Sequence, residues 1–325
     1  MTGKIITVRG EIEPHELGFC QPHEHLYCAA GLPARIYPPL LIDDAEKSAA
    51  EAKKYYSAGG RAAGDAQPPF TGRSAEALKD ISEASDLHII ASTGFHKLSW
   101  YGKEQDKGSL FIKLNEDQLA DIFTSEITTG MFAETSYTET AIAETHARTG
   151  IRAGQIKTAL EREFTETHKK LFSAAAAASV NTGVPVMIHV DKDADPLALL
   201  NFLVEKGVKP NKLIFCHIDR FFSDITVHRE IAETGAYLEY DTIARPKYHS
   251  EEKETSLILE IFDSGFEDNI MMSLDTTRDR LESYGGDPGL CYLLKTYIPE
   301  LKKRGVSDSI LKKVFVANPA EAYTC

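Results

Sequence analysis

Long apolar runs, paired cysteines and basic clusters are all scarce in this chain of 325 residues. No stretch approaches the roughly 18 consecutive apolar residues of a membrane-spanning helix, and residues 1–10 lack the apolar core of a signal peptide. The five cysteines, at positions 20, 28, 216, 291 and 325, show no CxxC spacing, which argues against a disulfide framework and against a thiolate zinc site. We therefore expect a cytoplasmic protein with free thiols that does not associate with membranes.

Positive charge is also in deficit. The chain has 36 Lys+Arg against 49 Asp+Glu, so its formal net charge is −13. Proteins that bind nucleic acid need a basic stripe to neutralise phosphates, and none is visible here. We expect a small molecule, rather than nucleic acid, as the partner.

Short apolar segments alternate with longer amphipathic ones along the whole chain, which is typical of βαβ units on a parallel sheet. Repeats and linkers are absent, so we predict a single domain over residues 1–325. Asp195-Pro196 predicts the start of one helix and Gly183 the end of another. The eight predicted strands cover residues 17–25, 60–66, 87–92, 152–157, 184–189, 212–217, 236–241 and 269–274.

Eight such alternations in a chain of this length predict a (β/α)8 barrel. A doubly wound sheet is the alternative, but no GxGxxG follows the first predicted strand. Residues 131–148 form an extra acidic stretch, which either covers the site, mediates a homodimer, or does neither.

Histidines and one carboxylate stand at the ends of the predicted strands. His23 and His25 are two residues apart on the first strand, so their side chains lie on the same side. His189 and His217 each end an apolar strand, and Asp275 follows the eighth. The carboxyl ends of barrel strands meet at one rim, so these five side chains are candidate metal ligands. A lone histidine at a strand end more often packs in a core, and it is the combination that favours a metal site.

Lys157 ends the fourth predicted strand at the same rim, whereas Cys216 is predicted to face away from His217 into the core. An ammonium group is repelled by metal ions. The lysine therefore either turns to solvent or to a substrate anion, or reacts with carbon dioxide to give a carbamate that can bridge two metals. The residues alone leave these alternatives open.

This ordered set of residues resembles the phosphotriesterase family of the amidohydrolase superfamily. The neighbouring motifs are similar too: Pro22-His23-Glu24-His25, Thr93-Gly94-Phe95, Ile151-Arg152-Ala153-Gly154 and Asn318-Pro319-Ala320. The resemblance implies a distorted (β/α)8 TIM barrel with a binuclear metal centre at the C-terminal ends of the strands. It implies that His23, His25 and Asp275 hold one ion, that His189 and His217 hold the other, and that carboxylated Lys157 bridges them with a hydroxide.

The same resemblance implies a metal-dependent hydrolase. Zinc suits this ligand set, and manganese or cobalt would fit it as well. Two divalent ions lower the pKa of bound water and polarise a carbonyl or phosphoryl oxygen. Asp275 would be the catalytic residue that accepts the hydroxide's proton and passes it to the leaving oxygen.

The metal ligands do not distinguish the substrates, so the substrate class is inferred from the loops after the seventh and eighth strands, which commonly bind phosphate in barrels. We predict that Lys247, Arg278 and Tyr284 bind a terminal phosphate, with Tyr248, Arg245 and Arg280 as substitutes. A lactonase for long acyl chains should have apolar loops, whereas a single leucine lies between Asp275 and Gly286.

We therefore expect a lactonase that opens a phosphorylated sugar lactone of the pentono-1,4-lactone 5-phosphate type. The alternatives are a phosphotriesterase or an acyl-homoserine lactonase with the same metals, and a non-catalytic barrel that only binds metal or a sugar phosphate. His96, Lys97, Trp100 and Tyr101, after the third strand, either contact substrate or pack the loop.

Overall fold

Parallel strands form a closed barrel in the computed structural model, which describes residues 3–102, 107–133 and 148–325. In these ranges the barrel strands are β3 (Cys20–Glu24), β4 (Ala62–Asp65), β5 (His88–Ile90), β6 (Ser92–Gly94), β7 (Gln155–Leu160), β8 (Val186–Val190), β9 (Leu213–Cys216), β10 (Tyr237–Tyr240) and β11 (Ile270–Met272). Their hydrogen-bonded orders are β3-β4-β5 and β6-β7-β8-β9-β10-β11. A single residue, Ala91, separates β5 from β6, so these two segments act as one barrel strand. The amide of Asp275 donates to the carbonyl of His23 at 3.1 Å and closes the ring.

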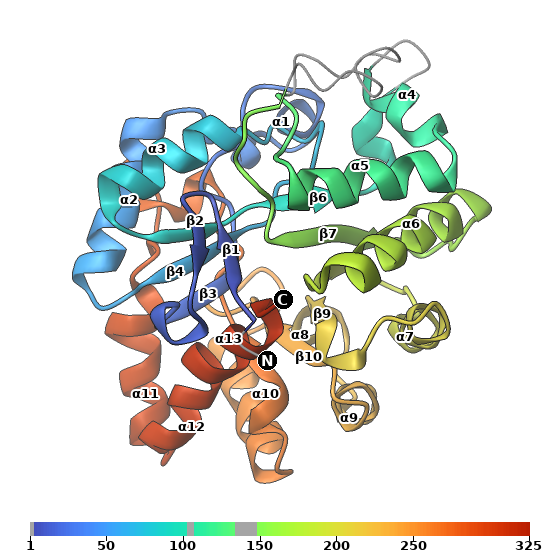
Figure 1. Cartoon of the computed structure of the whole chain (residues 1–325). Coiled ribbons are helices and arrows are strands. Elements are labelled where there is room, and N and C mark those ends of the chain that lie inside the picture. Colours follow the sequence, from blue (N-terminus) through green and yellow to red (C-terminus); the bar gives the residue numbers. More distant parts are fainter. Residues whose placement is uncertain (1–2, 103–106, 134–147) are drawn as a thin grey trace.

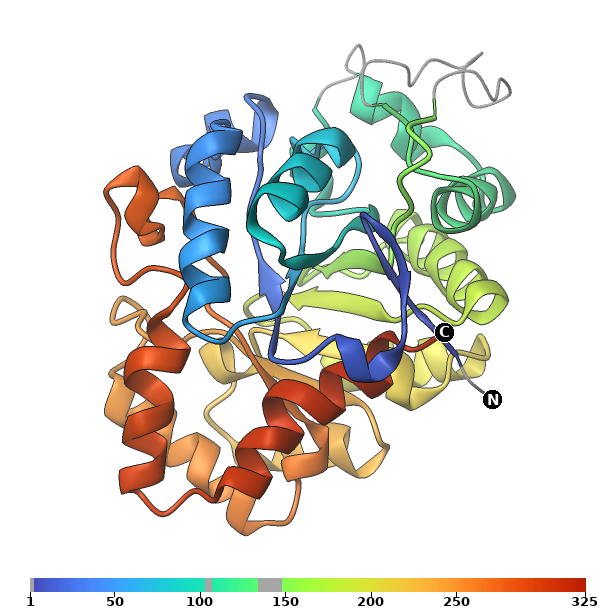
Figure 2. The same ribbon diagram turned by 60° about the vertical axis from the view of Figure 1, so that its left-hand side comes forward.

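Helices surround the strands (Figures 1 and 2). Those that follow the successive barrel strands are α2 (Ala45–Ser57), α3 (Ala75–Ser85), α5 (Glu116–Thr128), α6 (Glu166–Thr182), α7 (Pro196–Glu205), α9 (Ile225–Glu233), α10 (Glu251–Asp263) and, after β11, α11 (Ile298–Lys303), α12 (Asp308–Lys312) and α13 (Asn318–Tyr323). Shorter helices α1 (Leu32–Ile36), α4 (Lys107–Lys113) and α8 (Ile218–Phe221) lie in the loops after strands. The predicted helix signals are confirmed, because Asp195 caps α7 and Gly183 ends α6 with a φ of 79°.

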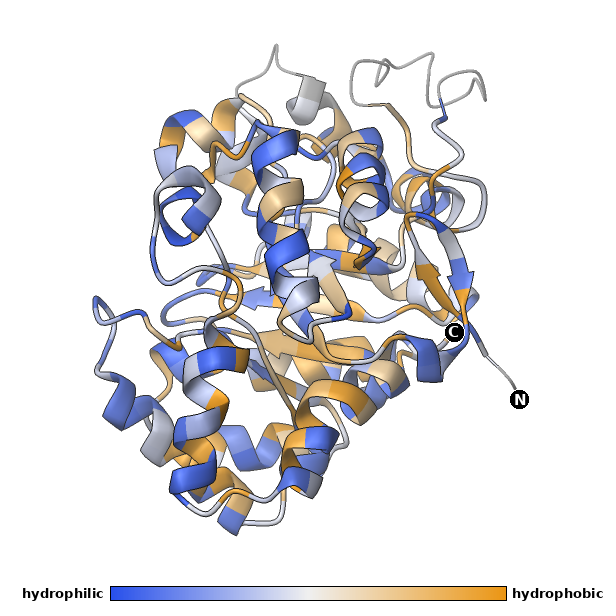
Figure 3. Ribbon diagram, turned by 90° about the vertical axis from the view of Figure 1, so that its left-hand side faces the viewer, coloured by the Kyte–Doolittle hydropathy of each residue, from blue (hydrophilic) through white to orange (hydrophobic). Residues whose placement is uncertain are grey.

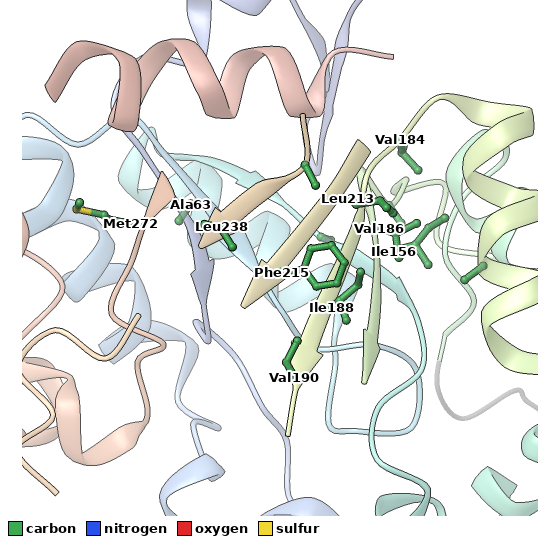
Figure 4. Close-up of a cluster of buried hydrophobic side chains, with 14 of the residues drawn as sticks. Ala63, Ile156, Val184, Val186, Ile188, Val190, Leu213, Phe215, Leu238 and Met272 are labelled. Atoms are coloured by element: carbon green, nitrogen blue, oxygen red, sulfur yellow. The ribbon is translucent and has the colours of Figure 1, made fainter. Parts of the chain in front are cut away.

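The core lies between the strands and the helices. Ile156, Val186, Ile188 and Phe215 gather on the neighbouring strands β7, β8 and β9 (Figure 4) and are fully buried. Met187 alternates with Val186 and Ile188 and joins a separate cluster. Hydrophilic residues run along the helices nearest the viewer in Figure 3, with hydrophobic strands behind them. Side chains alternate between the two faces of a strand with a period of 2, and they return to the same face of a helix with a period of 3.6 residues, so such a layered distribution is expected for a barrel.

Every predicted strand overlaps an observed one, but the fourth is displaced. It was expected over residues 152–157 and runs over Gln155–Leu160, so Lys157 lies inside the strand rather than at its end. The amide of Ala153 donates to the carbonyl of Glu126 on α5, which takes this segment out of the sheet. The hairpin β1 (Ile5–Thr7) and β2 (Gly10–Ile12) was not predicted. Its Ile5 packs in a small buried cluster with Tyr323 of α13.

Most of the acidic stretch 131–148 lies outside the described residues. At its described edges Phe132 forms an antiparallel bridge with Arg148. No helix within the described ranges is long and apolar enough to span a bilayer.

A buried ion pair joins the loop after β4 to helix α5. Arg73 (1% exposed) donates to both carboxylate oxygens of Glu126 at 2.8 and 2.9 Å, and Thr93 donates to the same carboxylate at 2.5 Å. Removing one partner leaves the other charge buried without a counterion. We therefore expect Glu126→Ala to lower the free energy of unfolding by about 3–5 kcal/mol. Urea unfolding measures it, with Glu83→Ala, at an exposed position of α3, as the control. Equal stability of the two variants would contradict the expectation.

Candidate metal centre

Three predicted ligands meet where the first strand adjoins the eighth. His23 lies in β3, His25 directly follows it, and Asp275 follows β11. The Nε2 atoms of His25 and His23 lie 3.2 and 3.7 Å from Oδ1 of Asp275. All three side chains are buried, and their ligand atoms lie within 4.8 Å of one another. This group could hold one divalent cation.

The second pair of histidines lies alongside. His189 of β8 and His217 after β9 face each other, with Nδ1 of His189 only 2.7 Å from Nε2 of His217. The ring centroids of His217 and His23 are 5.1 Å apart. These two nitrogens are at hydrogen-bond distance from each other, and in the tautomers that present both lone pairs they could bind a shared cation.

The backbone is strained at the rim formed by the carboxyl ends of the strands. His217 has a φ of 66°, Ala244 of 55° and Asp275 of 47°, although none is glycine. Such left-handed residues each cost about 1–3 kcal/mol and cluster at functional sites. The turn at His217 also ends the strand alternation, so Cys216 lies near His23, Glu239 and Asp241 instead of facing away from them. The prediction that Cys216 faces the opposite side was therefore wrong, although its burial was correct.

Lys157 reaches the centre from the middle of β7. It is fully buried, and its Nζ lies 3.1 Å from Nε2 of His23. Within the ranges that the structure describes, no carboxylate forms an ion pair with this Nζ. Burying an ammonium group without a counterion is costly.

Carboxylates behind the histidines set the orientation of the rings. Asp241 accepts from Nδ1 of His217 at 2.7 Å, and Glu239 accepts from Nδ1 of His23 at 3.2 Å. Partners on Nδ1 leave Nε2 of the same ring directed at the centre. Sequence reasoning missed both carboxylates, although they flank Tyr240: Glu239 lies in β10 and Asp241 directly follows it.

Glu24, the middle residue of the HxH motif, joins the first strand to the eighth. Its two oxygens accept the amides of Leu274 and Thr276 at 2.9 and 3.0 Å, on either side of Asp275. Burial raises the pKa of Glu24 to about 7. The carboxylate thus fixes the strained turn that presents Asp275.

Protonation states suit metal binding. Burial lowers the pKa of His23 to about 4 and that of His189 to about 3, so both rings are neutral near pH 7. Burial alone would raise the pKa of Asp275, but Arg245, His25, His23 and Arg220 hold it well below its usual range. Neutral imidazoles and an ionised carboxylate are the forms that bind divalent cations.

A cavity of about 230 Å³ opens over these residues. Besides the histidines and Asp275, its lining includes Tyr37, Arg220, Arg245, Lys247, Tyr248 and Thr277. Lys247 and Tyr248 were predicted here. The other predicted phosphate residues lie elsewhere: Tyr284 donates its hydroxyl to the carbonyl of Asp44, and Arg278 packs over the Tyr284 ring.

Two arginines flank Asp275. Nη2 of Arg220 lies 2.9 Å, and Nη2 of Arg245 3.1 Å, from Oδ2 of Asp275. Arg245 was predicted only as a substitute for another role, and Arg220 was not predicted. Arg220 stands three residues after His217, where helix α8 turns it back over the centre. Arg280, another substitute, donates to the carbonyls of Ile243 and Ala244 and supports the loop.

A parallel (β/α)8 barrel with histidines and a carboxylate at the C-terminal rim defines the class of metal-site barrels. The chain matches the model of the phosphotriesterase family over residues 3–323, and it belongs to this family, as the sequence motifs predicted.

Similar proteins cover almost the full chain. A phospho-furanose lactonase from Mycoplasmopsis agalactiae is 28% identical over 98% of this chain and 90% of that protein. An N-acetyltaurine hydrolase from Bos taurus is 26% identical over 100% of this chain and 99% of that protein. The crystal structure of a lactonase from Listeria monocytogenes is 28% identical, with a TM-score of 0.88 and 99% of each chain covered. An amidohydrolase from Mycoplasma synoviae has 25% identity and a TM-score of 0.92 over 99% of this chain and 92% of that one. The predicted barrel fold is confirmed.

Proposed function

We propose that this protein is a metal-dependent hydrolase that opens a phosphorylated sugar lactone, of the pentono-1,4-lactone 5-phosphate type. One observation carries the substrate class. Lys247 stands at the mouth of the cavity, exposed between the rings of Tyr37 and Tyr248, and none of the described residues pairs a carboxylate with it. An unpaired cation beside two phenol groups suits a phosphate. The similarity to phospho-furanose lactonases supports the same assignment.

The proposed ligand set is His23, His25 and Asp275 for one ion and His189 and His217 for the other, bridged by carboxylated Lys157. Addition of carbon dioxide to the neutral Lys157 amine forms an N–C bond, releases one proton, and gives a carbamate anion. Two divalent ions, zinc by ligand preference and manganese or cobalt as alternatives, would supply an activated hydroxide and polarise the lactone carbonyl.

The chain's own residues complete the reaction. Asp275 takes the proton of the attacking oxygen and delivers it to the ring oxygen as the carbonyl carbon–oxygen bond breaks. Arg220 and Arg245 hold Asp275 in the orientation that this transfer needs. Lys247, Tyr37 and Tyr248 bind the phosphate, while Arg278 and Tyr284 support the loop behind them.

Lys247→Ala tests the anion site. We expect kcat/KM for a phosphorylated lactone to fall about 10- to 100-fold, the worth of a charged hydrogen bond, while the unphosphorylated lactone is unaffected. Lys253→Ala, an exposed lysine six residues further on, is the matched control. Unchanged kcat/KM for the phosphorylated compound would count heavily against the assignment.

A second candidate is hydrolysis of an acyl amide that carries a sulfonate. The N-acetyltaurine hydrolases from Bos taurus and Danio rerio, 26% and 27% identical, favour it. A sulfonate is tetrahedral and anionic like a phosphate, so it suits the same lysine.

One set of assays separates the candidates. Proton release would be followed for a 5-phosphorylated pentono-1,4-lactone, its unphosphorylated counterpart and an acyl-homoserine lactone, and amine release for N-acetyltaurine. Turnover of the phosphorylated lactone alone supports the proposal. Turnover of the acyl lactone or of the amide instead refutes it and selects that alternative, and inactivity on all four compounds points to a phosphotriester.

A further inference from the structure

His96 lines the cavity and carries a hydrogen-bond donor that has no partner among the residues that the structure describes. The ring lies over Trp100 with centroids 3.9 Å apart and planes at 9°. Its backbone amide donates to the hydroxyl of Tyr101 at 2.7 Å, and its centroid is 5.0 Å from that of His189. The side chain lines the cavity yet is only 4% exposed. Stacking and the backbone bond thus hold the ring in one orientation beside the candidate metal centre.

The tautomer of this ring follows from one hydrogen bond. The backbone amide of Lys97 donates to Nδ1 of His96 at 2.8 Å. A backbone N–H can only donate, so Nδ1 is an acceptor and the proton of the neutral ring resides on Nε2. Across the described residues, nothing accepts a hydrogen bond from this Nε2–H. A donor held rigidly at a cavity wall without an acceptor is a site for an oxygen of the ligand.

The position of His96 identifies that oxygen. His96 follows β6, in the third barrel strand, and Lys247 follows β10, the seventh, so they stand on opposite sides of the eight-stranded ring. In a pentono-1,4-lactone 5-phosphate, C1 is the carbonyl, and C4, which carries the phosphorylated C5, joins C1 through the ring oxygen. On the other side of C1 lies C2 with its hydroxyl. With the phosphate at Lys247 and C1 at the metal centre, the C2 oxygen is directed toward His96.

We propose that His96 is a specificity residue whose Nε2–H binds the C2 hydroxyl oxygen of the lactone, an inference that rests on the proposed function. The neighbouring Lys97 is engaged with Asp191 at 2.8 Å, so His96 offers a neutral donor on this wall where Lys97 is already paired. The protein therefore selects lactones that are hydroxylated next to the carbonyl over their 2-deoxy counterparts.

The test is a double-mutant cycle between protein and substrate. We would measure kcat/KM of the unmodified protein, His96→Phe and His96→Gln on a phosphorylated pentono-1,4-lactone and on its 2-deoxy analogue, with metal content determined for each. Phenylalanine keeps the stacking on Trp100 and removes the donor, and glutamine retains an N–H. We expect His96→Phe to lose about tenfold on the 2-hydroxy lactone and little on the deoxy one, and His96→Gln to recover part of the loss.

Each result decides something. Equal losses by His96→Phe on both lactones, or no loss on either, would overturn the role of His96 while leaving the lactonase assignment intact. Failure of the unmodified protein to hydrolyse either lactone would overturn the proposed function and this inference with it. A selective loss at unchanged metal content supports both.

Discussion

Replacing Lys157 with methionine is expected to abolish hydrolysis and to remove bound metal. Methionine matches the length of the buried stem but can form no carbamate. Changes to residues behind the ligands already cost up to about 100-fold in metal affinity, so loss of a bridging ligand should cost more. Metal analysis of the purified variant and kcat on the phosphorylated lactone measure the effect.

The matched control is Lys212→Met, because Lys212 lies at the far end of β9, where its Nζ donates to the carbonyl of Ala322 at 2.8 Å. It should retain metal and turnover. A carbon NMR signal from the unmodified protein grown or incubated with 13C-bicarbonate, absent in Lys157→Met, would identify the carbamate directly. A Lys157→Met protein that kept two metals and full activity would refute the bridging role.

The second large effect is expected at Asp275. Asparagine keeps the shape of the side chain but is not a base, and general acid–base catalysis contributes about 10²–10⁴-fold, so kcat should fall about 10³-fold. The other five proposed ligands remain, and most of the metal should too. Steady-state kinetics and metal content together give the result.

This variant also separates an enzyme from a barrel that only binds. If the protein only bound metal or a sugar phosphate, it would need no proton acceptor at Asp275, so Asp275→Asn would bind a phosphorylated lactone as tightly as the unmodified protein, and the unmodified protein would show no turnover. Thr277→Val, at the same rim and two residues on, is the control for a general disturbance of the loop after β11. A loss of kcat in Asp275→Asn that Thr277→Val does not show would assign the proton transfer to Asp275.

Much of the barrel could be predicted because burial on parallel strands leaves a local pattern. Strands such as β8 and β9 are short, continuous and apolar, with turn residues at both ends. The sequence could not show that β7 begins three residues late, because a backbone bond between Ala153 and Glu126, far away in sequence, decides it. The hairpin β1–β2 depends likewise on burial of Ile5 against the C-terminal helix.

The candidate histidines and Asp275 could be identified because each is a distinctive residue type near the end of an apolar strand, whereas Lys157, inside β7, was identified through the family resemblance. The carboxylates that hydrogen-bond the histidines could not be identified from the sequence. Glu239 and Asp241 look like any alternating acidic pair until β10 is placed beside β9. The residues that the sequence predicts to bind phosphate show the same limit. Lys247 and Tyr284 are both polar loop residues in sequence, and only the packing of Tyr284 against α2 removes it from the cavity.

The left-handed backbone at His217, Ala244 and Asp275 sets a limit on engineering this protein. A search that scored stability alone would select glycine at all three positions, because glycine relieves the same strain. At His217 and Asp275 that gain would delete the side chains around which the centre is built, so the most stable and the most active sequences diverge there. Ala244 has no side chain in the centre, so replacing it with glycine can raise stability without removing a candidate ligand.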